Sequence, residues 1–387
     1  MSLAPDGLGD LRVPPAPTAH LSRSTPDGSV YRDVRVYRQD LERFFYRSWL
    51  CVGREEDLPD EGSFLTQFVG TESILISRNA SGEIHAFYNV CRHRGTRVVT
   101  ARSGRAKTFV CPYHSWTYDV DGRLVGAAHT KEIANFRREE NGLFPLRVDR
   151  WGGFLFVNFD EEARPFREEF ETFVRGHDRY AFERLRLAAS RTYEVEANWK
   201  IIVENYSECY HCAPVHPSLN RLTPYLTGQN DSYYLGGERR SKFAGGWMEF
   251  DKDYTSMTRN GYTKRSPLPG SRPEDLKRVY YHTLFPNLFF SLFPDYLMTH
   301  RAWPVSPTHT AIQNEFYFDP AAMASPGFDP SDAVDIWDEI NRQDWKVCEL
   351  AQLGSTSRIW HGGRYADQES LVSDFDQFVE EQRDPPG

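Results

Sequence analysis

Four side chains, arranged as two short pairs, constrain the fold of this chain more than any other feature. Cys91 and His93 stand two positions apart, and Cys111 and His114 stand three apart. Each pair lies beside a short β-type run, and the 17 residues between the pairs are enough for a hairpin that brings them together. Two thiolates and two imidazoles that meet in this way can hold a [2Fe–2S] cluster, with sulfur ligands on one iron and nitrogen ligands on the other. A structural zinc ion accepts the same donors, although zinc modules usually have Cys-X2-Cys or His-X3-His spacings.

The residues around these pairs carry a family resemblance. The runs Cys91-Arg92-His93-Arg94-Gly95 and Cys111-Pro112-Tyr113-His114-Ser115-Trp116 resemble the two halves of the Rieske motif in the α subunits of ring-hydroxylating oxygenases. The resemblance covers about residues 40 to 375 and implies that the two Cys and two His bind a [2Fe–2S] cluster. Ser115 stands where Gly is often found, a replacement that also occurs in choline- and betaine-oxidising relatives.

A second group of metal-binding residue types lies between Asn198 and Pro217. Glu208 and His211 are three apart, so they are predicted to share one face of a helix that starts at Asn198. This helix should end at Ala213-Pro214, so that His216 folds back beside His211. Two histidines and one carboxylate on one side of an iron leave the opposite positions open for O2 and substrate. An ordinary amphipathic helix also carries such polar pairs, so the spacing alone does not decide between the two interpretations.

This segment resembles the mononuclear iron motif of the same family, in which an acid, two residues, a His, four residues and a second His follow one another. The resemblance implies that His211 and His216 bind Fe(II), with Asp344 from a late helix as the third ligand. Glu208 would not bind iron, and would instead bridge two subunits by contacting His211 of its own chain and His114 of the next. On sequence alone, four other acids compete with Asp344, namely Asp335, Asp338, Glu339 and Glu349.

The composition narrows the class of protein. A net charge of −9 argues against nonspecific binding to nucleic acid. No signal-peptide pattern and no uninterrupted apolar stretch of membrane-spanning length are present. The six cysteines are few and irregularly spaced, so a secreted disulfide framework is not expected, and a cytoplasmic location follows as the default. Cys209 and Cys212 flank His211 and are predicted to be packing residues, because a Cys-X2-Cys redox pair normally starts a helix in a thioredoxin-like unit.

The predicted fold is α+β. We expect a β-rich Rieske [2Fe–2S] domain at residues 45–160 and a catalytic mononuclear iron domain at residues 161–387, with an antiparallel sheet covered by helices. Residues 1–44 should belong to the catalytic domain, with about the first 30 extended over the surface. A hairpin turn is predicted at Asp119–Gly122. Helices are predicted at 32–49, at 164–185, from Asn198 onward and at 331–353, the last capped by Ser331 and Asp332 and stopped by Gly354.

The resemblance implies the oxygenase component of a Rieske-type non-heme iron oxygenase that works as a head-to-tail homotrimer. The chain lacks a dinucleotide-binding fingerprint, so a separate NAD(P)H-dependent flavin or iron–sulfur reductase should supply electrons for the reaction with O2. A pure electron carrier of the Rieske ferredoxin type and a zinc-stabilised binding protein are the alternatives from other classes. The extra length and the second metal motif argue against the former.

The predicted substrate is a quaternary ammonium compound, such as a betaine or a carnitine-like molecule, oxidised at an N-methyl carbon. Glu208 replaces the Asp that is commonest in the family, as in the betaine and carnitine branch. Aromatic faces can hold a methylated ammonium by cation–π attraction. Hydroxylation of an aromatic acid is the alternative reaction. The aromatic residues considered for the pocket are Tyr206, Phe289, Phe290, Tyr296, Trp303 and Trp360.

Overall fold

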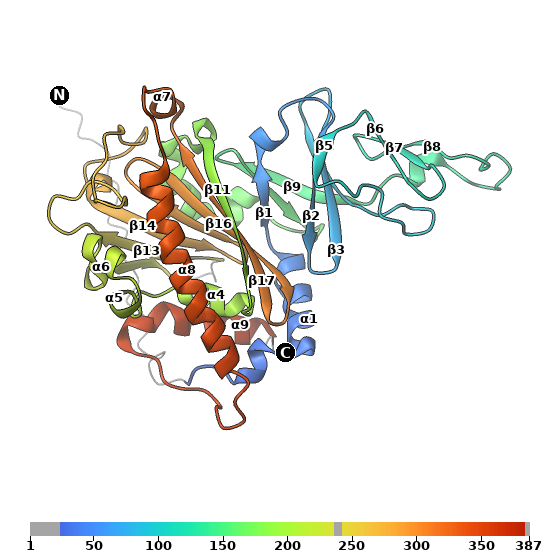
Figure 1. Cartoon of the computed structure of the whole chain (residues 1–387). Helices are drawn as coiled ribbons and strands as arrows, with labels where there is room; N and C mark the ends of the chain where they lie inside the picture. Colours follow the sequence, from blue (N-terminus) through green and yellow to red (C-terminus); the bar gives the residue numbers. More distant parts are fainter. Residues whose placement is uncertain (1–23, 236–241, 384–387) are drawn as a thin grey trace, which may run out of the picture.

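The computed structural model describes residues 24–235 and 242–383, so the segment expected to lie extended over the surface falls largely outside the described residues. A first sheet has seven strands in the order β1-β10-β9-β4-β3-β2-β5. Its strands are β1 (Leu50–Arg54), β2 (Ser63–Val69), β3 (Glu72–Arg78), β4 (Ile84–Tyr88), β5 (Ser103–Arg105), β9 (Pro145–Trp151) and β10 (Phe154–Asn158). A small sheet projects from it (Figure 1) and consists of β6 (Thr108–Val110), β7 (Thr117–Asp119) and β8 (Leu124–Gly126).

The turn predicted between β7 and β8 is present. The Asp119 side chain accepts the N–H groups of Asp121 and Arg123, and Gly122 adopts a φ of 78°. This left-handed conformation suits Gly, which has no Cβ to clash.

A second sheet, also of seven strands, is antiparallel throughout and has the order β11-β17-β16-β15-β14-β13-β12. Helix α8 (Ser331–Gly354) runs across one face of this sheet (Figure 1). The predicted α+β architecture, with an antiparallel sheet covered by helices, is therefore confirmed. The strands are β11 (Arg186–Val195), β12 (Gln229–Ser232), β13 (Phe243–Glu249), β14 (Arg278–Leu284), β15 (Leu288–Leu292), β16 (Leu297–Ser306) and β17 (His309–Phe318).

Several predicted helix boundaries were wrong. The helix expected at 32–49 is α1 (Val34–Arg43), followed by a 3-10 turn. The segment expected to be helical at 164–185 is broken into α2 (Phe166–Glu169), α3 (Glu171–His177) and two 3-10 turns, because Ala181 between these turns adopts a left-handed φ of 49°. Helix α8 starts at the predicted Ser331 and ends at Gly354, one residue past the predicted end. The predicted Asp332 accepts the N–H of Ala333, and Asp329, which was not predicted, accepts the N–H of Ser331.

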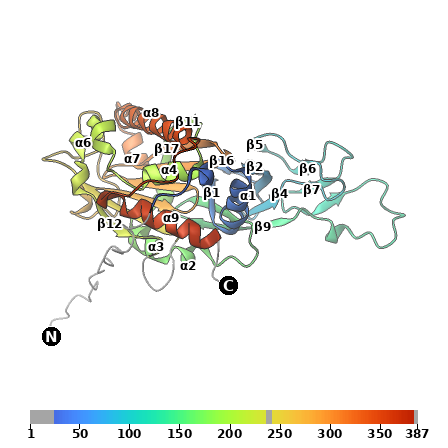
Figure 2. The same cartoon turned by 90° about the horizontal axis from the view of Figure 1, so that it is seen from below.

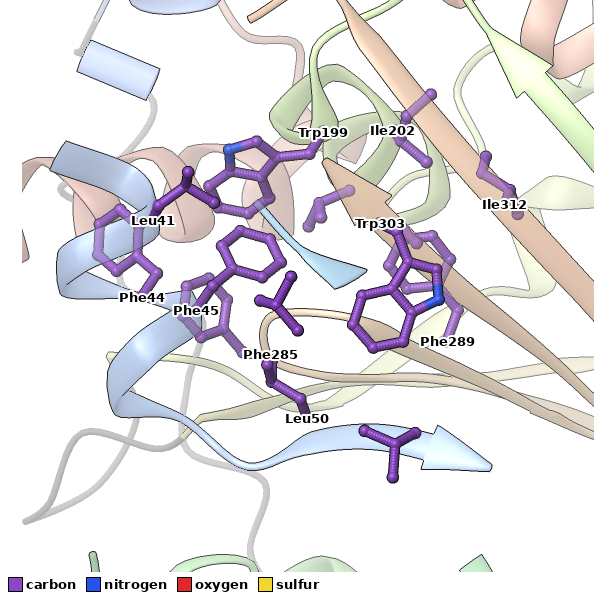
Figure 3. Packing of buried hydrophobic residues seen from close by; sticks show 14 of the residues in the cluster. Leu41, Phe44, Phe45, Leu50, Trp199, Ile202, Phe285, Phe289, Trp303 and Ile312 are labelled. Carbon is purple, nitrogen blue, oxygen red and sulfur yellow. The ribbon is translucent and has the colours of Figure 1, made fainter. Parts of the chain in front are cut away.

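One hydrophobic core joins the two large sheets (Figure 3). Trp199, at the start of α4 (Trp199–Tyr206), packs edge-on against Phe45 and Phe285 with ring centroids 5.1 and 6.0 Å apart. Leu50 of the first sheet and Phe289 of the second belong to the same cluster, and both are fully buried. Burial of aromatic side chains at this density fixes α4 against both sheets, and the end of α4 leads directly into the His-containing segment.

Buried charges reinforce this junction. Asp40 of α1 pairs with Lys200 of α4 and with Arg383 of α9 (Ser370–Arg383), the latter at 2.7 Å. Asp40 also accepts a hydrogen bond from the Trp199 indole. Three helices from distant parts of the chain are thereby held around one carboxylate.

The two groups of candidate metal ligands lie far apart within one chain. The small sheet β6–β8 lies at one end of the molecule, and α6 (Pro217–Leu222) lies at the other, in both views (Figures 1 and 2). Across the described ranges, no helix is both long and apolar enough to cross a membrane.

Candidate metal centres

The first centre is built by two loops of the same design. Cys91 and Cys111 each donate their N–H to the carbonyl five positions onward, at 2.8 Å in both loops. The carbonyl of each Cys accepts the N–H of the residue four positions onward, which is Gly95 in one loop and Ser115 in the other, at 3.0 Å in both. Gly95 and Ser115 have left-handed φ values of 69° and 56°. The Gly often found at the position of Ser115 is thus explained by the backbone, since a left-handed φ costs any residue with a Cβ.

The loops place the sulfur donors inside and the nitrogen donors at the surface. Cys91 and Cys111 are buried free thiols, and burial raises the pKa of Cys111. The rings of His93 and His114 are exposed and lie 4.6 Å apart between centroids. The Tyr118 oxygen lies 3.4 Å from the Cys91 sulfur and accepts the backbone N–H of Arg92. The hydroxyl hydrogen of Tyr118 is therefore free to be donated to the sulfur. Separate pairs of donors suit two different irons.

Zinc fits this arrangement less well. Donor atoms around one tetrahedral zinc, at bond lengths of about 2.0–2.3 Å, lie within about 4 Å of one another. Within the described part of the chain, the one group of three or more His, Cys, Asp or Glu donors that converges within 4.8 Å is His211, His216 and Asp344. The Cys and His donors of the Rieske-type motif form no such group, and their separation into a sulfur pair and a nitrogen pair fits a two-iron cluster.

The second centre brings together three predicted residues. One carboxylate oxygen of Asp344 lies 3.2 Å from Nε2 of His211 and 2.8 Å from Nε2 of His216. The three donor atoms lie within 4.8 Å of one another, and the His216 side chain is almost fully buried. A carboxylate and two imidazoles from one side are the donor set that non-heme Fe(II) accepts, so the residues fit the metal.

The local structure that positions the histidines differs from the prediction. Helix α4 begins at the predicted cap, where the Asn198 side chain accepts the Lys200 N–H, but it ends at Tyr206. Glu208 and His211 therefore do not share a helix, and the predicted end at Ala213-Pro214 was wrong because both residues lie inside the short helix α5 (Cys212–Val215). Pro is tolerated there because the first-turn N–H groups of a helix have no partner inside it.

Each histidine has a hydrogen-bond partner on the ring nitrogen that faces away from Asp344. Nδ1 of His211 bonds Glu208, whose other oxygen accepts the His211 backbone N–H at 3.1 Å. Nδ1 of His216 lies 2.7 Å from Oε1 of Gln343. An amide or carboxylate oxygen accepts a hydrogen, so each Nδ1 carries the proton and each Nε2 presents a lone pair to a metal. Gln343 was not predicted, and nothing in the sequence marks it except its place before Asp344.

The electrostatics of this centre favour a cation. Burial disfavours the protonated form of His211, but hydrogen bonds to Asp344 and Glu208 outweigh it and raise its pKa to about 10. Burial disfavours the charged form of Asp344, yet its bonds to His211 and His216 lower its pKa overall. A divalent ion between Asp344 and the two Nε2 atoms would meet the same negative potential that otherwise attracts protons.

The acids that competed with Asp344 have other partners. Asp338 bonds Tyr193 and Arg342. The remaining three point to other contacts: Asp335 pairs with Arg259, Glu339 with Ser218 and Arg259, and Glu349 with the backbone of Glu196.

Cys209 and Cys212 form a disulfide next to His211, so their prediction as mere packing residues was wrong. The hydrogen bond from Cys212 N to Cys209 O, at 3.0 Å, closes a tight turn that sets the two sulfurs beside each other. The Cys-X2-Cys spacing was the sequence signal for this disulfide. It was given little weight because the sequence predicts no thioredoxin-like unit.

A cavity of about 350 Å³ opens beside this centre. One face of α8 lines it at helical spacing, through Trp337, Ile340, Asn341 and Asp344. Of the aromatic residues considered from sequence, Tyr206 alone is among the lining residues; Phe289, Phe290, Tyr296 and Trp303 are buried in the core and Trp360 packs against it. The aromatic side chains that line the cavity are Tyr206, Tyr225, Trp247, Tyr281, Trp337 and Trp345.

Two family models match the chain along the same division. Residues 48–137 match the Rieske [2Fe-2S] domain, and residues 182–384 match the catalytic domain of the ring hydroxylating alpha subunit. This pairing defines the class: the protein is the catalytic subunit of a Rieske-type oxygenase, an oxidoreductase with a [2Fe–2S] domain and a domain that binds mononuclear iron.

Known proteins of similar sequence agree with this class. The chain is 38% identical over 343 residues to the carnitine monooxygenase oxygenase subunit of Acinetobacter baumannii, covering 86% of this chain and 85% of that protein. It is 30% identical over 359 residues to the glycine betaine monooxygenase oxygenase subunit of Pseudomonas aeruginosa, covering 87% and 83%. The crystal structure of the quaternary ammonium Rieske monooxygenase CntA with L-carnitine superposes with a TM-score of 0.72 at 27% identity, covering 94% and 95% of the two chains. The chain belongs to the ring-hydroxylating oxygenase α-subunit family.

Proposed function

We propose that this enzyme oxidises an N-methyl carbon of a quaternary ammonium compound. The observation that carries the proposal is the aromatic lining of the cavity beside His211, His216 and Asp344. A methylated ammonium cannot donate hydrogen bonds and is held by aromatic faces, at about 0.5–2 kcal/mol per ring. The names of the carnitine and glycine betaine monooxygenase subunits that the chain resembles point to the same substrate class.

The residue roles are part of the same proposal. Cys91, His93, Cys111 and His114 hold the [2Fe–2S] cluster, and His211, His216 and Asp344 hold Fe(II), within the domain limits 45–160 and 161–387. When bound, the ferrous ion supplies the O2-activating chemistry through its open positions. The protein supplies the aromatic surface that orients the methyl group and the two Nδ1 partners that keep the imidazoles in the metal-binding tautomer.

The overall reaction balances as a monooxygenation. O2, two electrons and two protons give one water, and the second oxygen atom enters a methyl C–H bond. The resulting hydroxymethyl ammonium loses its C–N bond, releasing formaldehyde, a proton and a tertiary amine. The same chemistry at the carbon that links nitrogen to the rest of the substrate would release trimethylamine instead, so the amine product identifies the carbon attacked.

We infer two partners: a separate flavin or iron–sulfur reductase that delivers the electrons, and further copies of this chain in a head-to-tail homotrimer. The two candidate centres lie at opposite ends of one chain, so a neighbour's cluster must serve each iron site (Figures 1 and 2). A ring closes such a heterologous contact. His114 is exposed, and Glu208 retains unused lone pairs beside His211, so the two can meet across subunits. Replacing Glu208 with Gln should leave both metals bound and slow turnover.

A single-turnover experiment tests the substrate class without knowledge of the reductase. Protein reduced chemically and freed of excess reductant is mixed with O2 and glycine betaine, choline or an aromatic acid. Formaldehyde in proportion to active sites is expected with the ammonium substrates. If these give neither formaldehyde nor trimethylamine while the aromatic acid is hydroxylated, the proposal is wrong.

A further inference from the structure

The cavity beside the iron-binding residues has charged lining residues of one sign. Glu208 and Asp344 lie on its wall, and Asp367 lies at its exposed rim. Within residues 24–235 and 242–383, no Lys or Arg lines the cavity. A ligand that enters this cavity therefore meets carboxylates and aromatic rings, but no described basic side chain.

The third histidine of the lining does not supply a positive charge either. Burial lowers the pKa of His300 to about 4, so the imidazole is neutral near pH 7. Its Nε2 faces Oδ1 of Asn341 at 3.1 Å. The Asn341 amide nitrogen in turn faces Oδ1 of Asn314, whose own amide nitrogen donates to a backbone carbonyl. This chain of hydrogen bonds fixes His300 as a neutral donor at Nε2.

Two arginines near the cavity lining already have aromatic or acidic partners. Arg278 stacks on the Trp247 ring, 3.8 Å from its centroid, and lies 3.4 Å from a Glu249 oxygen. Arg221 stacks on Tyr254 and donates to its hydroxyl. Each guanidinium thus already faces an aromatic ring, and neither arginine is among the described residues that line the cavity.

Asp367 is the lining carboxylate whose charge a bound ferrous ion would leave unbalanced. The three lining carboxylates carry −3, and a bound ferrous ion would carry +2, which Asp344 and Glu208 balance beside it. One negative charge, that of Asp367, remains, and no salt bridge from a described Lys or Arg reaches it. An unbalanced carboxylate at the mouth of a low-dielectric, aromatic cavity attracts a cation and repels an anion at distances of several ångströms.

We propose that the cavity selects a substrate with a cationic head and an uncharged remainder, such as a quaternary amino alcohol or an alkyltrimethylammonium, over a zwitterionic betaine, and that Asp367 is a specificity-determining residue. This inference rests on the proposed oxidation of quaternary ammonium compounds. The carboxylate of a betaine would lose its hydration on entry and find no described cation in return. A hydroxyl or alkyl tail carries no such penalty.

A competition experiment tests the inference. Reduced protein is mixed with O2 and equimolar choline and glycine betaine, and the amount of each consumed is measured. The ratio equals the ratio of kcat/KM, and choline is expected to be favoured by at least tenfold. Calorimetric Kd values for the two compounds provide a readout that does not depend on turnover.

Two substitutions at the rim assign the effect to charge. Asp367→Asn should weaken choline binding by about three- to tenfold, the size of one screened Coulomb interaction at this kind of distance. Asp367→Lys should narrow or invert the preference by favouring glycine betaine. Asp253→Asn is the matched control, because Asp253 is also exposed and lies outside the cavity lining. This variant should change neither the affinity for choline nor the preference for choline over glycine betaine.

The outcomes separate this inference from the proposed function. Preference for glycine betaine in the unmodified enzyme, or a ratio unmoved by Asp367→Lys, overturns the inference while leaving quaternary ammonium oxidation intact. Consumption of neither compound, with hydroxylation of an aromatic acid instead, removes both.

Discussion

The hydrogen bond between Gln343 and His216 gives the sharpest test of how the iron site is positioned. Oε1 of Gln343 lies 2.7 Å from Nδ1 of His216, and the imidazole is almost fully buried. Replacing Gln343 with Leu keeps a similar volume but removes the acceptor, so a buried N–H loses its partner at a cost of about 1–3 kcal/mol. Because the lost bond orients a proposed metal ligand, we expect Fe(II) affinity to fall about 10- to 100-fold.

The physical reason is the tautomer of the imidazole. Nδ1 donates to Gln343, and Nε2 lies 2.8 Å from Asp344, so Nε2 is the nitrogen that a metal would bind in place of a proton. Without the acceptor, the proton can move to Nε2, where it competes with the metal, or the ring can turn. Gln343→Glu restores an acceptor at the same position and should recover at least the affinity of the unmodified protein.

The assay is retention of ferrous iron during dialysis against graded concentrations of a chelator, with the absorbance of the [2Fe–2S] cluster recorded in the same samples. Arg342→Leu is the matched control, since this neighbouring side chain on α8 is largely exposed and points away from the iron site to Asp338. Thermal unfolding of each variant shows whether the fold is retained. Iron retention by a folded Gln343→Leu variant equal to that of the unmodified protein would refute the reasoning, as would failure of Glu to restore it.

Four further outcomes follow from the structure. Asp344→Ala should lose mononuclear iron and activity but keep the cluster absorbance, and iron analysis showing full occupancy would move the third ligand elsewhere. Asp40→Ala should lower the free energy of unfolding by about 3–5 kcal/mol, measured in urea, because it leaves the buried charge of Lys200 without a partner. Ser115→Gly should raise the free energy of unfolding by roughly 0.5–1 kcal/mol, because removing the strain of a φ of 56° outweighs the larger conformational entropy that Gly loses on folding. An unchanged or lower thermal midpoint would contradict this strain. Burial raises the pKa of Asp374 from 3.8 to about 6, so its contribution to stability is full below pH 3.8 and is lost as pH rises through 6. Between pH 4 and 6, the urea midpoint of Asp374→Asn should therefore fall less than that of the unmodified protein. Parallel plots of urea midpoint against pH for the two proteins would exclude the raised pKa of Asp374.

Local sequence predicted those parts of the sites that are built within a few residues. The two cysteine loops close through hydrogen bonds that span four or five positions, so the residues needed to form each loop are contiguous. Asn198 caps α4 through its own side chain, which explains why the start of this helix was predictable. His211 and His216 also meet within one short segment.

The end of α4 shows where local signals failed. Ser207 bonds the Val203 carbonyl through its hydroxyl at 2.6 Å, which takes a helix acceptor at the point where the helix stops. The residue type and neighbours of Ser207 give no sequence signal for this role. Pro214, the stronger signal, predicted an end where a new helix had just begun.

Motif spacing fixes local geometry, so the amino-acid pattern was enough to predict the residue types at each metal centre and the class of protein that they define. The packing of distant elements determines which acid of α8 reaches the histidines, that Gln343 holds His216, and that Asp367 lies at the rim of the same cavity. More than 100 residues separate Asp344 from His216, and helical periodicity alone left five acids as candidates. Which of the five acids faces the histidines depends on how helix α8 is oriented about its own axis where it packs across the second sheet. That orientation is set by the buried face of the whole helix rather than by any one position.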